Sequence, residues 1–377
     1  MRIALLCHNY APHLGGIELV VENLGRRLAL SNDVAVVSTA WRGNAGVTQE
    51  HGMTVHRLPA LHVAERRGVP YPIPLGPGVR EAIRALAQAD VLHAHGSLYP
   101  TTLLGMAVAR TKRIPFVVTE HVGLVSYRSS VLERVQRGAW AVMGKPVLRS
   151  AAAVTVLNAR IADWLRTQHE SLAPRLIANG VDFERFRPLP LQERQVRRAA
   201  LGIPPDGPVA LFVGRNNPKK NLDAVLRIPR ESFHLVVCGD GRDLSGDRLI
   251  EVGIMPHHRM ADIYACADVL VHAGTGEGFP LTVQEAMACG VPVVLLWDEG
   301  YSPSLSTEIV VACDSFTELG RETIALLADP ARRASLSERA RSFAQRHWSW
   351  ERATAEYASL YEECVLARAG AVAGAVP

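Results

Sequence analysis

The sequence predicts an α/β protein of two doubly wound domains that face each other across a cleft. Three observations lead to this prediction. Apolar, strand-like runs alternate with amphipathic, helix-like segments, as in parallel sheets with crossover helices. The alternation restarts after a polar, proline-rich passage at 183–208. At 377 residues the chain also exceeds one ordinary hydrophobic core.

In the first half, apolar runs predict the strands and amphipathic segments predict the clearest helices. The strands are RIALLC (2–7), DVAVVST (33–39), TVHRL (54–58), VLHAH (91–95), PFVVTEH (115–121) and AAVTVLN (152–158). The helices are GIELVVENLGRRLAL (16–30) and PGVREAIRALAQA (77–89).

The second half repeats the pattern. Its strands are PVALFVGR (208–215), FHLVVCGD (233–240), RLIEVG (248–253), DVLVHAG (268–274), PVVLLW (292–297) and EIVVAC (308–313). The passage 183–208 is predicted to be a linker with a short helix. Near the end, 338–370 forms one long helical pattern, and 369–377 lacks periodicity and should be frayed. The expected domains are 1–185 and 186–350, with 351–377 returning to the first.

Composition excludes several classes of protein. A net charge of only +4 makes nucleic acid an unexpected partner. The longest apolar runs, such as 291–297, fall far short of the ~18 residues that suggest a membrane span. The N-terminus is predicted to be a first strand rather than a signal peptide, so the expected location is cytoplasmic. The six cysteines form no C-x-x-C pair and should be buried free thiols. No metal site is expected, because the histidines lack ligand spacing.

Ligands of doubly wound sheets lie outside the carboxyl ends of the strands, so the loops there are the candidate sites. After the first strand, Gly15 and Gly16 open a helix. Their backbone N–H groups could approach an anion, and a plain tight turn explains them equally well. No G-x-G-x-x-G follows this strand, which argues against a dehydrogenase.

A second loop follows the strand that ends at Gly214. Arg215 and Lys220 stand on either side of this loop, and a guanidinium with an ammonium suits a diphosphate. Two ordinary surface cations are the alternative. Lys219 adjoins Lys220, and spacing alone does not decide which lysine points inward.

The third loop, GEGFPLTVQE, places Glu277 and Glu285 on either side of a turn and helix start. The N–H groups of Phe279, Leu281 and Thr282 should point out of the helix start, with Pro280 in the first turn. Eight helical steps would span about 12 Å, which fits two contacts along an extended ligand better than one acid/base pair. Solvated glutamates are the structural alternative.

Together these loops resemble the retaining glycosyltransferases of GT-B fold, specifically glycosyltransferase family 4, whose domains are Rossmann-like. The segments that carry the resemblance are Glu277-GFPLTVQ-Glu285, Val213-Gly214-Arg215 with Lys220, EVGIMPHHRMADIYACADV (251–269), NGVDFERFRP (179–188), TEH (119–121) and HWSWERATAEYASLYEE (347–363). They span nearly the whole chain in the family's order.

The resemblance implies a nucleotide diphosphate sugar, UDP- or GDP-linked, as donor, and a metal-independent reaction with no cofactor. It implies that Glu277 contacts the sugar, that Glu285 holds the ribose, and that Arg215 and Lys220 stabilise the diphosphate. The remaining implied donor contacts are Gly16, His121, Gly214, Ile254, Gly278, Phe279, Pro280, Leu281 and Thr282. No D-x-D occurs in the chain, so a metal bridge to the diphosphate has no evident ligands.

Two segments depart from the family pattern. Ala273 and Gly274 stand where the family often has Pro-Ser, so a hydroxyl is lost and a different contact with the donor sugar is expected. The loop 295–305 replaces one that often contains Gly-Gly. A GT-B sugar-nucleotide epimerase and a non-catalytic nucleotide- or glycan-binding relative therefore stay open as alternatives to a transferase.

Acceptors, whether glycan, glycolipid or small molecule, are expected at the strand ends of the first domain. The candidates are Asn9, Tyr10, His95, Tyr99 and Tyr127. Between Arg110 and Arg149 stand eight Lys or Arg against two Glu. Within this stretch, 130–149 is either an amphipathic helix that touches an anionic membrane on the cytoplasmic face or an ordinary core helix.

Overall fold

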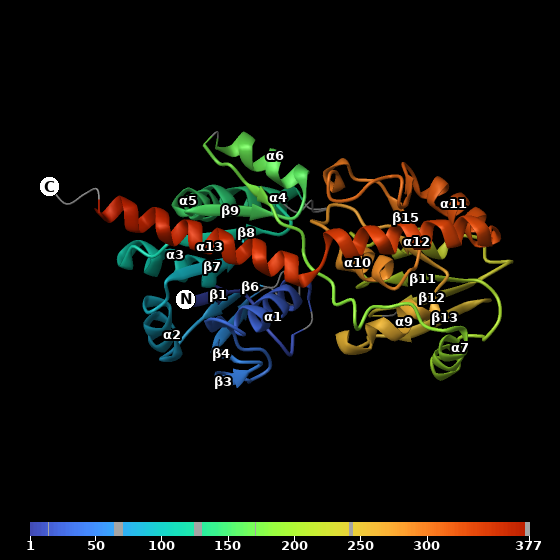
Figure 1. Ribbon diagram of the computed structural model, residues 1–377, viewed down its shortest axis with the longest axis horizontal. Coiled ribbons are helices and arrows are strands. Elements are labelled where there is room, and N and C mark those ends of the chain that lie inside the picture. The colour runs from blue at the N-terminus through green and yellow to red at the C-terminus, as the bar shows by residue number, and fades with distance from the viewer. Residues whose placement is uncertain (14, 64–70, 124–129, 170, 241–243, 374–377) are drawn as a thin grey trace. The chain divides into compact units, whose positions relative to one another are not determined.

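The computed structural model describes residues 1–13, 15–63, 71–123, 130–169, 171–240 and 244–373 (Figure 1). Contacts divide the chain into unit 1, Met1–Ala178 with Trp350–Pro377, and unit 2, Asn179–Ser349. The chain thus passes to unit 2 after Ala178 rather than after residue 185. The reason is that Asn179 and Val181 already bond to unit 2: the carbonyl of Asn179 accepts from Gln284, and the N–H of Val181 donates to Trp348.

Unit 1 is built on a sheet in the order β10-β9-β8-β7-β1-β2-β4-β3, parallel except at β3. Its strands are β1 (Arg2–Leu6), β2 (Asp33–Thr39), β3 (Gly46–Glu50), β4 (Met53–Leu58), β7 (Val91–His95), β8 (Phe116–Glu120), β9 (Ala153–Val156) and β10 (Arg175–Leu176), with a separate pair β5 (Ala60–Val63) and β6 (Tyr71–Pro74). Its helices are α1 (Gly16–Leu28), α2 (Gly78–Ala87), α3 (Pro100–Lys112), α4 (Ser130–Ala139), η2 (Trp140–Gly144), α5 (Lys145–Ser150), α6 (Ala159–Gln168) and α13 (Trp350–Ala373).

The core of unit 1 forms because its central strands are apolar on both faces, as expected for a parallel sheet covered by helices. Every residue of β7 and β8 is buried. One face carries Phe116 and Val118 against buried side chains of α2, α3, α5 and α6. The chain pattern at residues 2–7, 91–95 and 115–121 therefore predicted these strands correctly.

The C-terminal helix α13 packs against α1 and β7 of unit 1, and it is the long red helix in Figure 1. A buried histidine anchors it. His93 Nδ1 lies 2.7 Å from the hydroxyl of Tyr361, and His93 Nε2 lies 2.7 Å from that of Thr119. The guanidinium of Arg27 lies 5.3 Å from the ring centre of Trp350. A buried hydrogen bond and a cation–π contact thus both hold α13 to this unit.

The prediction of one long helix over 338–370 was wrong. The structure has two helices, α12 (Pro330–His347) and α13, separated at Trp348 and Ser349. Trp348 is buried, and its carbonyl accepts the N–H of Val181 at 2.7 Å. This bond to a distant segment replaces helical bonding. The tail was also expected to lack structure from residue 369, but α13 continues to Ala373.

Unit 2 is built on a parallel sheet in the order β13-β12-β11-β14-β15-β16. Its strands are β11 (Val209–Val213), β12 (His234–Cys238), β13 (Leu249–Gly253), β14 (Val269–His272), β15 (Val293–Leu296) and β16 (Val311–Cys313). Its helices are α7 (Leu191–Ala200), α8 (Leu222–Leu226), η3 (His257–Arg259), α9 (Met260–Cys266), α10 (Leu281–Ala288), η4 (Glu299–Tyr301), α11 (Phe316–Ala328) and α12.

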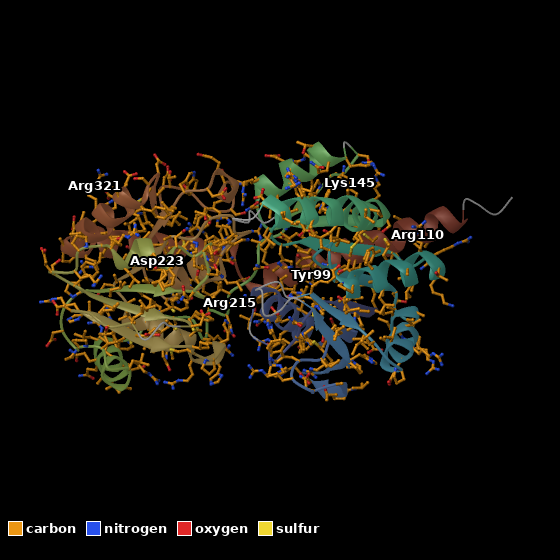
Figure 2. All side chains as sticks on the ribbon, turned by 180° about the vertical axis from the view of Figure 1, so that it is seen from behind. Tyr99, Arg110, Lys145, Arg215, Asp223 and Arg321 are labelled. Atoms are coloured by element: carbon orange, nitrogen blue, oxygen red, sulfur yellow. The ribbon has the colours of Figure 1, made fainter. Side chains whose placement is uncertain are left out.

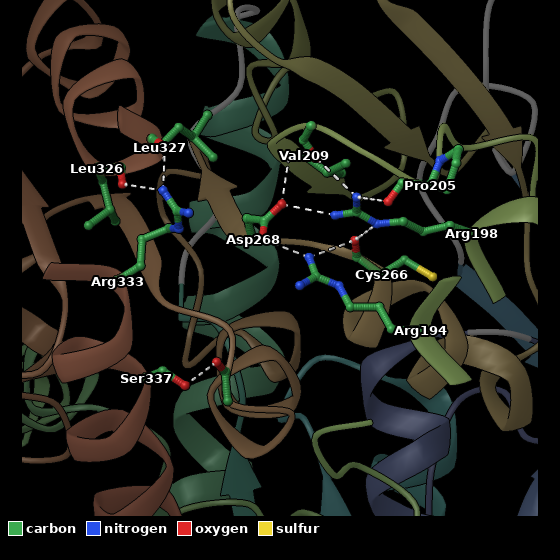
Figure 3. A network of polar contacts seen from close by, with 12 residues as sticks. Arg194, Arg198, Pro205, Val209, Cys266, Asp268, Leu326, Leu327, Arg333 and Ser337 are labelled. Carbon is green, nitrogen blue, oxygen red and sulfur yellow. Dashed lines mark hydrogen bonds and ion pairs between the residues drawn. The ribbon is translucent and has the colours of Figure 1, made fainter. Parts of the chain in front are cut away.

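A buried polar network joins α7 to the sheet of unit 2 (Figure 3). Asp268 accepts from Arg194 at 2.7 Å, from Arg198 at 2.9 Å and from the N–H of Val209 at 2.8 Å. Arg198 also donates to the carbonyl of Cys266 at 2.9 Å. This network fixes the predicted short helix of the 183–208 passage at the amino ends of β11 and β14.

The segment 130–149 has two faces. Trp140 and Val147 are buried in the core, as the core-helix interpretation predicts. Val131, Val135 and Val142 are 59%, 62% and 76% exposed. Their spacing of four and seven residues places them on one side of the helical stretch.

Among the described residues no helix is both long and apolar enough to cross a membrane. All six cysteines are buried free thiols, which confirms that prediction.

Candidate functional site

The candidate donor site of unit 2 lies where parallel strands end. β11 pairs in parallel with β12 and β14, and β12 with β13. Their carboxyl ends therefore meet at one edge of the sheet. The loops that follow these strands carry Arg215, Lys220, Ile254, Glu277 and the start of α10, so the fold brings the predicted donor residues to the same edge.

Two hydrogen bonds tie the loop after β11 to the loop after β14. The N–H of Thr275 donates to the carbonyl of Lys219 at 2.9 Å, and the amide of Asn221 donates to the carbonyl of Ala273 at 2.8 Å. Asn221 has a positive φ of 51°, a conformation that asparagine tolerates better than most residues. These bonds fix the two loops to each other, and so they also fix the backbone positions from which the loop side chains extend.

Lys220 and Glu277 form an ion pair at the centre of this edge. Lys220 Nζ lies 2.6 Å from Glu277 Oε1, and their side chains are 18% and 15% exposed. His272 Nε2 lies 3.8 Å from Glu277 Oε2. Burial alone would raise the pKa of Glu277, but Lys220 and His272 outweigh it, and the pKa is lowered. The carboxyl is therefore held ionised beside a cation.

Glycines shape the space around Lys220. A Cβ on Gly214 would lie 3.1 Å from Lys220 Cδ, so the lysine stem lies directly on this glycine. A Cβ on Gly239, at φ +157°, would lie 1.9 Å from the carbonyl oxygen of Gly214. The ends of β11 and β12 approach each other closely at this point, and only glycine fits at position 239.

Glu285 is held by two residues that the sequence interpretation did not assign. Its Oε1 accepts from His257 Nε2 at 2.7 Å, and its Oε2 accepts from the hydroxyl of Tyr264 at 2.9 Å. A carboxylate has about four acceptor positions. Two remain for hydroxyl groups of a ligand, so Glu285 is oriented without being saturated.

The helix α10 begins at Leu281, as expected, but Pro280 has a different place from the predicted one. This proline is the N-cap residue instead of lying in the first turn, and its carbonyl accepts from Val283 at 3.1 Å. Phe279 is buried edge-on against Tyr301 and Trp348. Thr282 Oγ1 is buried, and it has no hydrogen-bond partner among the described residues. Gly278 is buried and Leu281 half-buried beside it.

Arg215 and Ile254 differ from the other predicted donor residues because they are exposed. Ile254 is 67% exposed at the end of β13, and Arg215 follows β11 on the surface of unit 2 (Figure 2). An exposed apolar side chain at a strand end is suited to contact the flat face of a base. An exposed guanidinium can reach a ligand without breaking an internal contact.

In unit 1, the first helix starts at Gly16 with a buried carboxylate beside it. Glu18 Oε1 accepts from His13 Nδ1 at 2.6 Å, and His8 Nε2 lies 3.9 Å away. A Cβ on Gly15 would lie 2.3 Å from Glu18 Oε2. Gly15 has an extended φ of −167°, so a larger residue here would cause no backbone strain, but its Cβ would displace the Glu18 carboxylate. Contact of Gly16 with a ligand phosphate stays a prediction.

His95 and His121 form a buried pair, with His95 Nδ1 3.0 Å from His121 Nε2. Burial lowers the pKa of both rings, that of His121 to about 4, so both are neutral near pH 7. One ring must then donate and the other accept. The structure thus joins a predicted donor residue to a predicted acceptor residue at the carboxyl ends of β7 and β8.

The other acceptor candidates have different surroundings. Tyr99 stacks on the ring of His8 with centroids 3.9 Å apart, and it is half-buried (Figure 2). Asn9 accepts from Thr39 at 3.3 Å. Tyr10 is 1% exposed, so its ring belongs to the core. Tyr127 lies outside the described residues.

Relatives of known name cover most of this chain. A D-inositol 3-phosphate glycosyltransferase of Catenulispora acidiphila is 29% identical and aligns with 93% of this chain and 91% of its own. A GDP-mannose-dependent alpha-mannosyltransferase of Mycolicibacterium smegmatis is 30% identical, aligning with 78% of this chain and 79% of its own. Residues 14–185 match the family model Glycosyltransferase Family 4, and 193–343 match Glycosyl transferases group 1. The chain belongs to glycosyltransferase family 4.

The fold of this glycosyltransferase is GT-B, as predicted. The sucrose-phosphate synthase of Thermosynechococcus elongatus superposes with a TM-score of 0.77 at 23% identity, covering 97% of this chain and 99% of that one. Both units of the glycosyltransferase therefore have the predicted Rossmann-like form. The named relatives and the family model show that the chain is an enzyme of the transferase class.

Sequence reasoning missed three residues of this glycosyltransferase that touch its candidate donor site in unit 2. They are His257, Tyr264 and His272. In unit 1 it missed Glu18, which lies beside the start of α1. His257 and Tyr264 lie within the segment that resembles the family's base loop and following helix, so their position was signalled but not their contact with Glu285. His272 ends an apolar strand run, which made a core position the simpler interpretation.

Proposed function

We propose that this glycosyltransferase moves a sugar from a UDP- or GDP-sugar to a hydroxyl of a glycan, glycolipid or small molecule, with retention and without a metal ion. The observation that carries this proposal is the ion pair of Lys220 with Glu277 at the sheet edge where Glu285 also lies. Glu285 is held in place there by hydrogen bonds from His257 and Tyr264. Lys220 can bind a diphosphate, Glu277 can bind a sugar, and Glu285 can bind a ribose. The relative named for GDP-mannose supports a nucleotide-sugar donor.

The proposed roles follow from charge and hydrogen-bonding capacity. Lys220 and Arg215 stabilise the negative charge that develops on the departing diphosphate. Thr282 and the N–H groups at the start of α10 add donors there. Glu277 accepts from hydroxyls of the sugar, while Glu285 accepts from those of the ribose. Ile254 contacts the base.

The chemical step can be written without a metal or a covalent intermediate. The bond between the anomeric carbon and the diphosphate oxygen breaks, and the electron pair leaves with the diphosphate. The acceptor oxygen attacks the same face of the carbon. Its proton passes to the leaving phosphate oxygen. The positive field of Lys220, Arg215 and the helix start stabilises the leaving group, which is the task that a metal ion would otherwise perform.

A thermal-shift panel of UDP, GDP, ADP and dTDP tests the donor site. Ligand at a hundredfold excess over its dissociation constant stabilises the folded protein by about 2.7 kcal/mol, or roughly 5 °C in Tm for a domain of this size. One nucleotide should give this shift, and Glu285→Ala should abolish it. Glu299→Ala, a change elsewhere in unit 2, should keep it. Absence of a shift with every nucleotide would contradict the proposal.

We also propose that the exposed stripe of Val131, Val135 and Val142 contacts anionic membrane, where a glycolipid acceptor would lie. The evidence is a row of exposed apolar side chains within a basic segment. Burying one valine contributes about 1.5 kcal/mol or more. Val142→Asp should therefore weaken co-sedimentation with phosphatidylglycerol vesicles about tenfold.

Val196→Asp is the matched control for this membrane test, because Val196 is 68% exposed on α7 of unit 2. It should leave vesicle binding unchanged. Binding should also weaken with salt, since surface charges are screened. Equal binding by wild type and Val142→Asp, or no binding of wild type to anionic vesicles, would overturn the membrane proposal and leave the transferase proposal intact.

A further inference from the structure

His272 is a buried histidine directly beside Glu277, and the proposed reaction gives it no task. It is the last residue of β14, and its side chain is 3% exposed. Its Nε2 lies 3.8 Å from Glu277 Oε2, beyond hydrogen-bond distance. Within the described part of the chain this nitrogen has no hydrogen-bond partner. A buried polar atom without a partner is costly, so it points to a partner gained in another state.

The carboxylate of Glu277 is an acceptor close to this nitrogen, with its Oε2 3.8 Å from His272 Nε2. A Cβ on Gly274 would lie 2.8 Å from His272 Nε2 and 2.9 Å from Glu277 Oε1. Any larger residue at position 274 would occupy the space between the ring and the carboxylate. The departure from the family pattern at Gly274 therefore has a physical consequence, because it leaves the imidazole and the carboxylate free to meet.

Lys220 has two competing partners in the proposed reaction. In this structure its ammonium lies 2.6 Å from Glu277 Oε1. The same ammonium is proposed to stabilise the diphosphate when donor is bound. A lysine that turns toward the diphosphate weakens its bond to Glu277. His272 Nε2, 3.8 Å from the other oxygen of this carboxylate, can then move into hydrogen-bond distance.

We propose that His272 is a positioning residue that donates a hydrogen bond from Nε2 to Glu277 when Lys220 engages the diphosphate. This inference rests on the proposed function and adds a residue to it. The imidazole keeps the carboxylate aimed at the sugar while the lysine changes partner. Gly274 is part of the arrangement because it keeps the path between the two groups open.

The charge state of the ring suits this task. Burial lowers the pKa of His272 to about 4, although Glu277 acts in the opposite direction. The imidazole is therefore neutral near pH 7. A neutral ring can donate one N–H without adding a positive charge that would compete with Lys220 for the diphosphate.

The experiment compares His272→Leu with His272→Gln. Glutamine places an N–H donor near the position of Nε2, and leucine places none. The readout is the hydrolysis of UDP-glucose to UDP and glucose and of GDP-mannose to GDP and mannose, in which water replaces the acceptor hydroxyl. His272→Leu should lower kcat roughly 10- to 100-fold, the effect of losing a hydrogen bond to a charged group. His272→Gln should keep kcat within about threefold of wild type, and KM should change little in both.

Two further measurements separate this role from a structural one. The ring ¹⁵N signals of His272 should shift toward a hydrogen-bonded N–H on addition of UDP or GDP, and Gly274→Ala should suppress that shift and lower kcat. Equal kcat in all variants, or equal loss in His272→Leu and His272→Gln, would overturn the inference. If the wild type shows nucleotide-induced stabilisation and turnover in those cases, the proposed function still stands. If it shows neither, both fail.

Discussion

Lys220→Met should lower kcat for release of nucleoside diphosphate by about two to three orders of magnitude, the effect typical of removing one preorganised donor from a developing negative charge. Lys220 is the cation that the fold places against Glu277, at 2.6 Å. Its removal takes away charge stabilisation on the leaving group and the ion pair with a largely buried carboxylate. The measurement is steady-state release of UDP or GDP, with kcat and KM reported separately.

Lys219→Met is the matched control, because it removes the same charge one residue away. The carbonyl of Lys219 accepts from Thr275, which fixes its backbone. Its loss should lower kcat less than about tenfold, as for a screened surface charge. Equal losses in the two variants would contradict the assignment of Lys220 as the inward-pointing lysine.

The same ion pair predicts how stability depends on pH. The pKa of Glu277 is lowered in the folded state by Lys220 and His272 against the opposing effect of burial. A carboxyl whose folded-state pKa is depressed stabilises the fold above its unfolded pKa, near 4.5, and loses that contribution as pH falls through the folded value. Lys220→Met should therefore flatten the decline of unfolding free energy below pH 4.5.

Arg198→Ala should lower the free energy of unfolding of unit 2 by about 3–5 kcal/mol, the typical cost of removing one partner from a buried ion pair. Arg198 is 4% exposed and donates to Asp268 and to the carbonyls of Pro205, Gly207 and Cys266 (Figure 3). Alanine would leave all of these acceptors without that donor. Hydrogen exchange of the β11 amides and urea unfolding would measure the loss.

Arg321→Ala is the control, because it also truncates an arginine of unit 2. Arg321 pairs with Glu318 at 2.9 Å, but its side chain is 68% exposed. The cost should be about 1 kcal/mol or less. Comparable losses in Arg198→Ala and Arg321→Ala would show that the network under α7 does not stabilise unit 2.

Much of the fold was predictable, because periodicity is a local property of the chain. The runs at 208–215 and 268–274 became β11 and β14 with their loops at the expected ends. The break between α12 and α13 at Trp348 was not predictable. It depends on a hydrogen bond from the N–H of Val181 to the Trp348 carbonyl, and the periodicity of the sequence carries no information about a bond between such distant residues. The burial of Trp140 and exposure of Val142 likewise depend on which face of the segment meets the sheet.

The candidate site was predictable in residue types and in order. Glycines, cations and glutamates after strands indicated a phosphate and a polyhydroxyl ligand before any contact was known. The choice between Lys219 and Lys220 was not predictable. It depends on the bonds of Thr275 and Asn221 across two loops that are more than fifty residues apart in the chain.

The sequence by itself determined the two-fold repetition of strands and helices, the loops that carry chemistry, and the family. Only the tertiary structure decided that Lys220 pairs with Glu277, that His257 and Tyr264 orient Glu285, and that Gly274 leaves room for His272. The physical reason is that strand and helix patterns arise from neighbours in the chain, whereas burial and hydrogen-bond partners come from residues that only folding brings together.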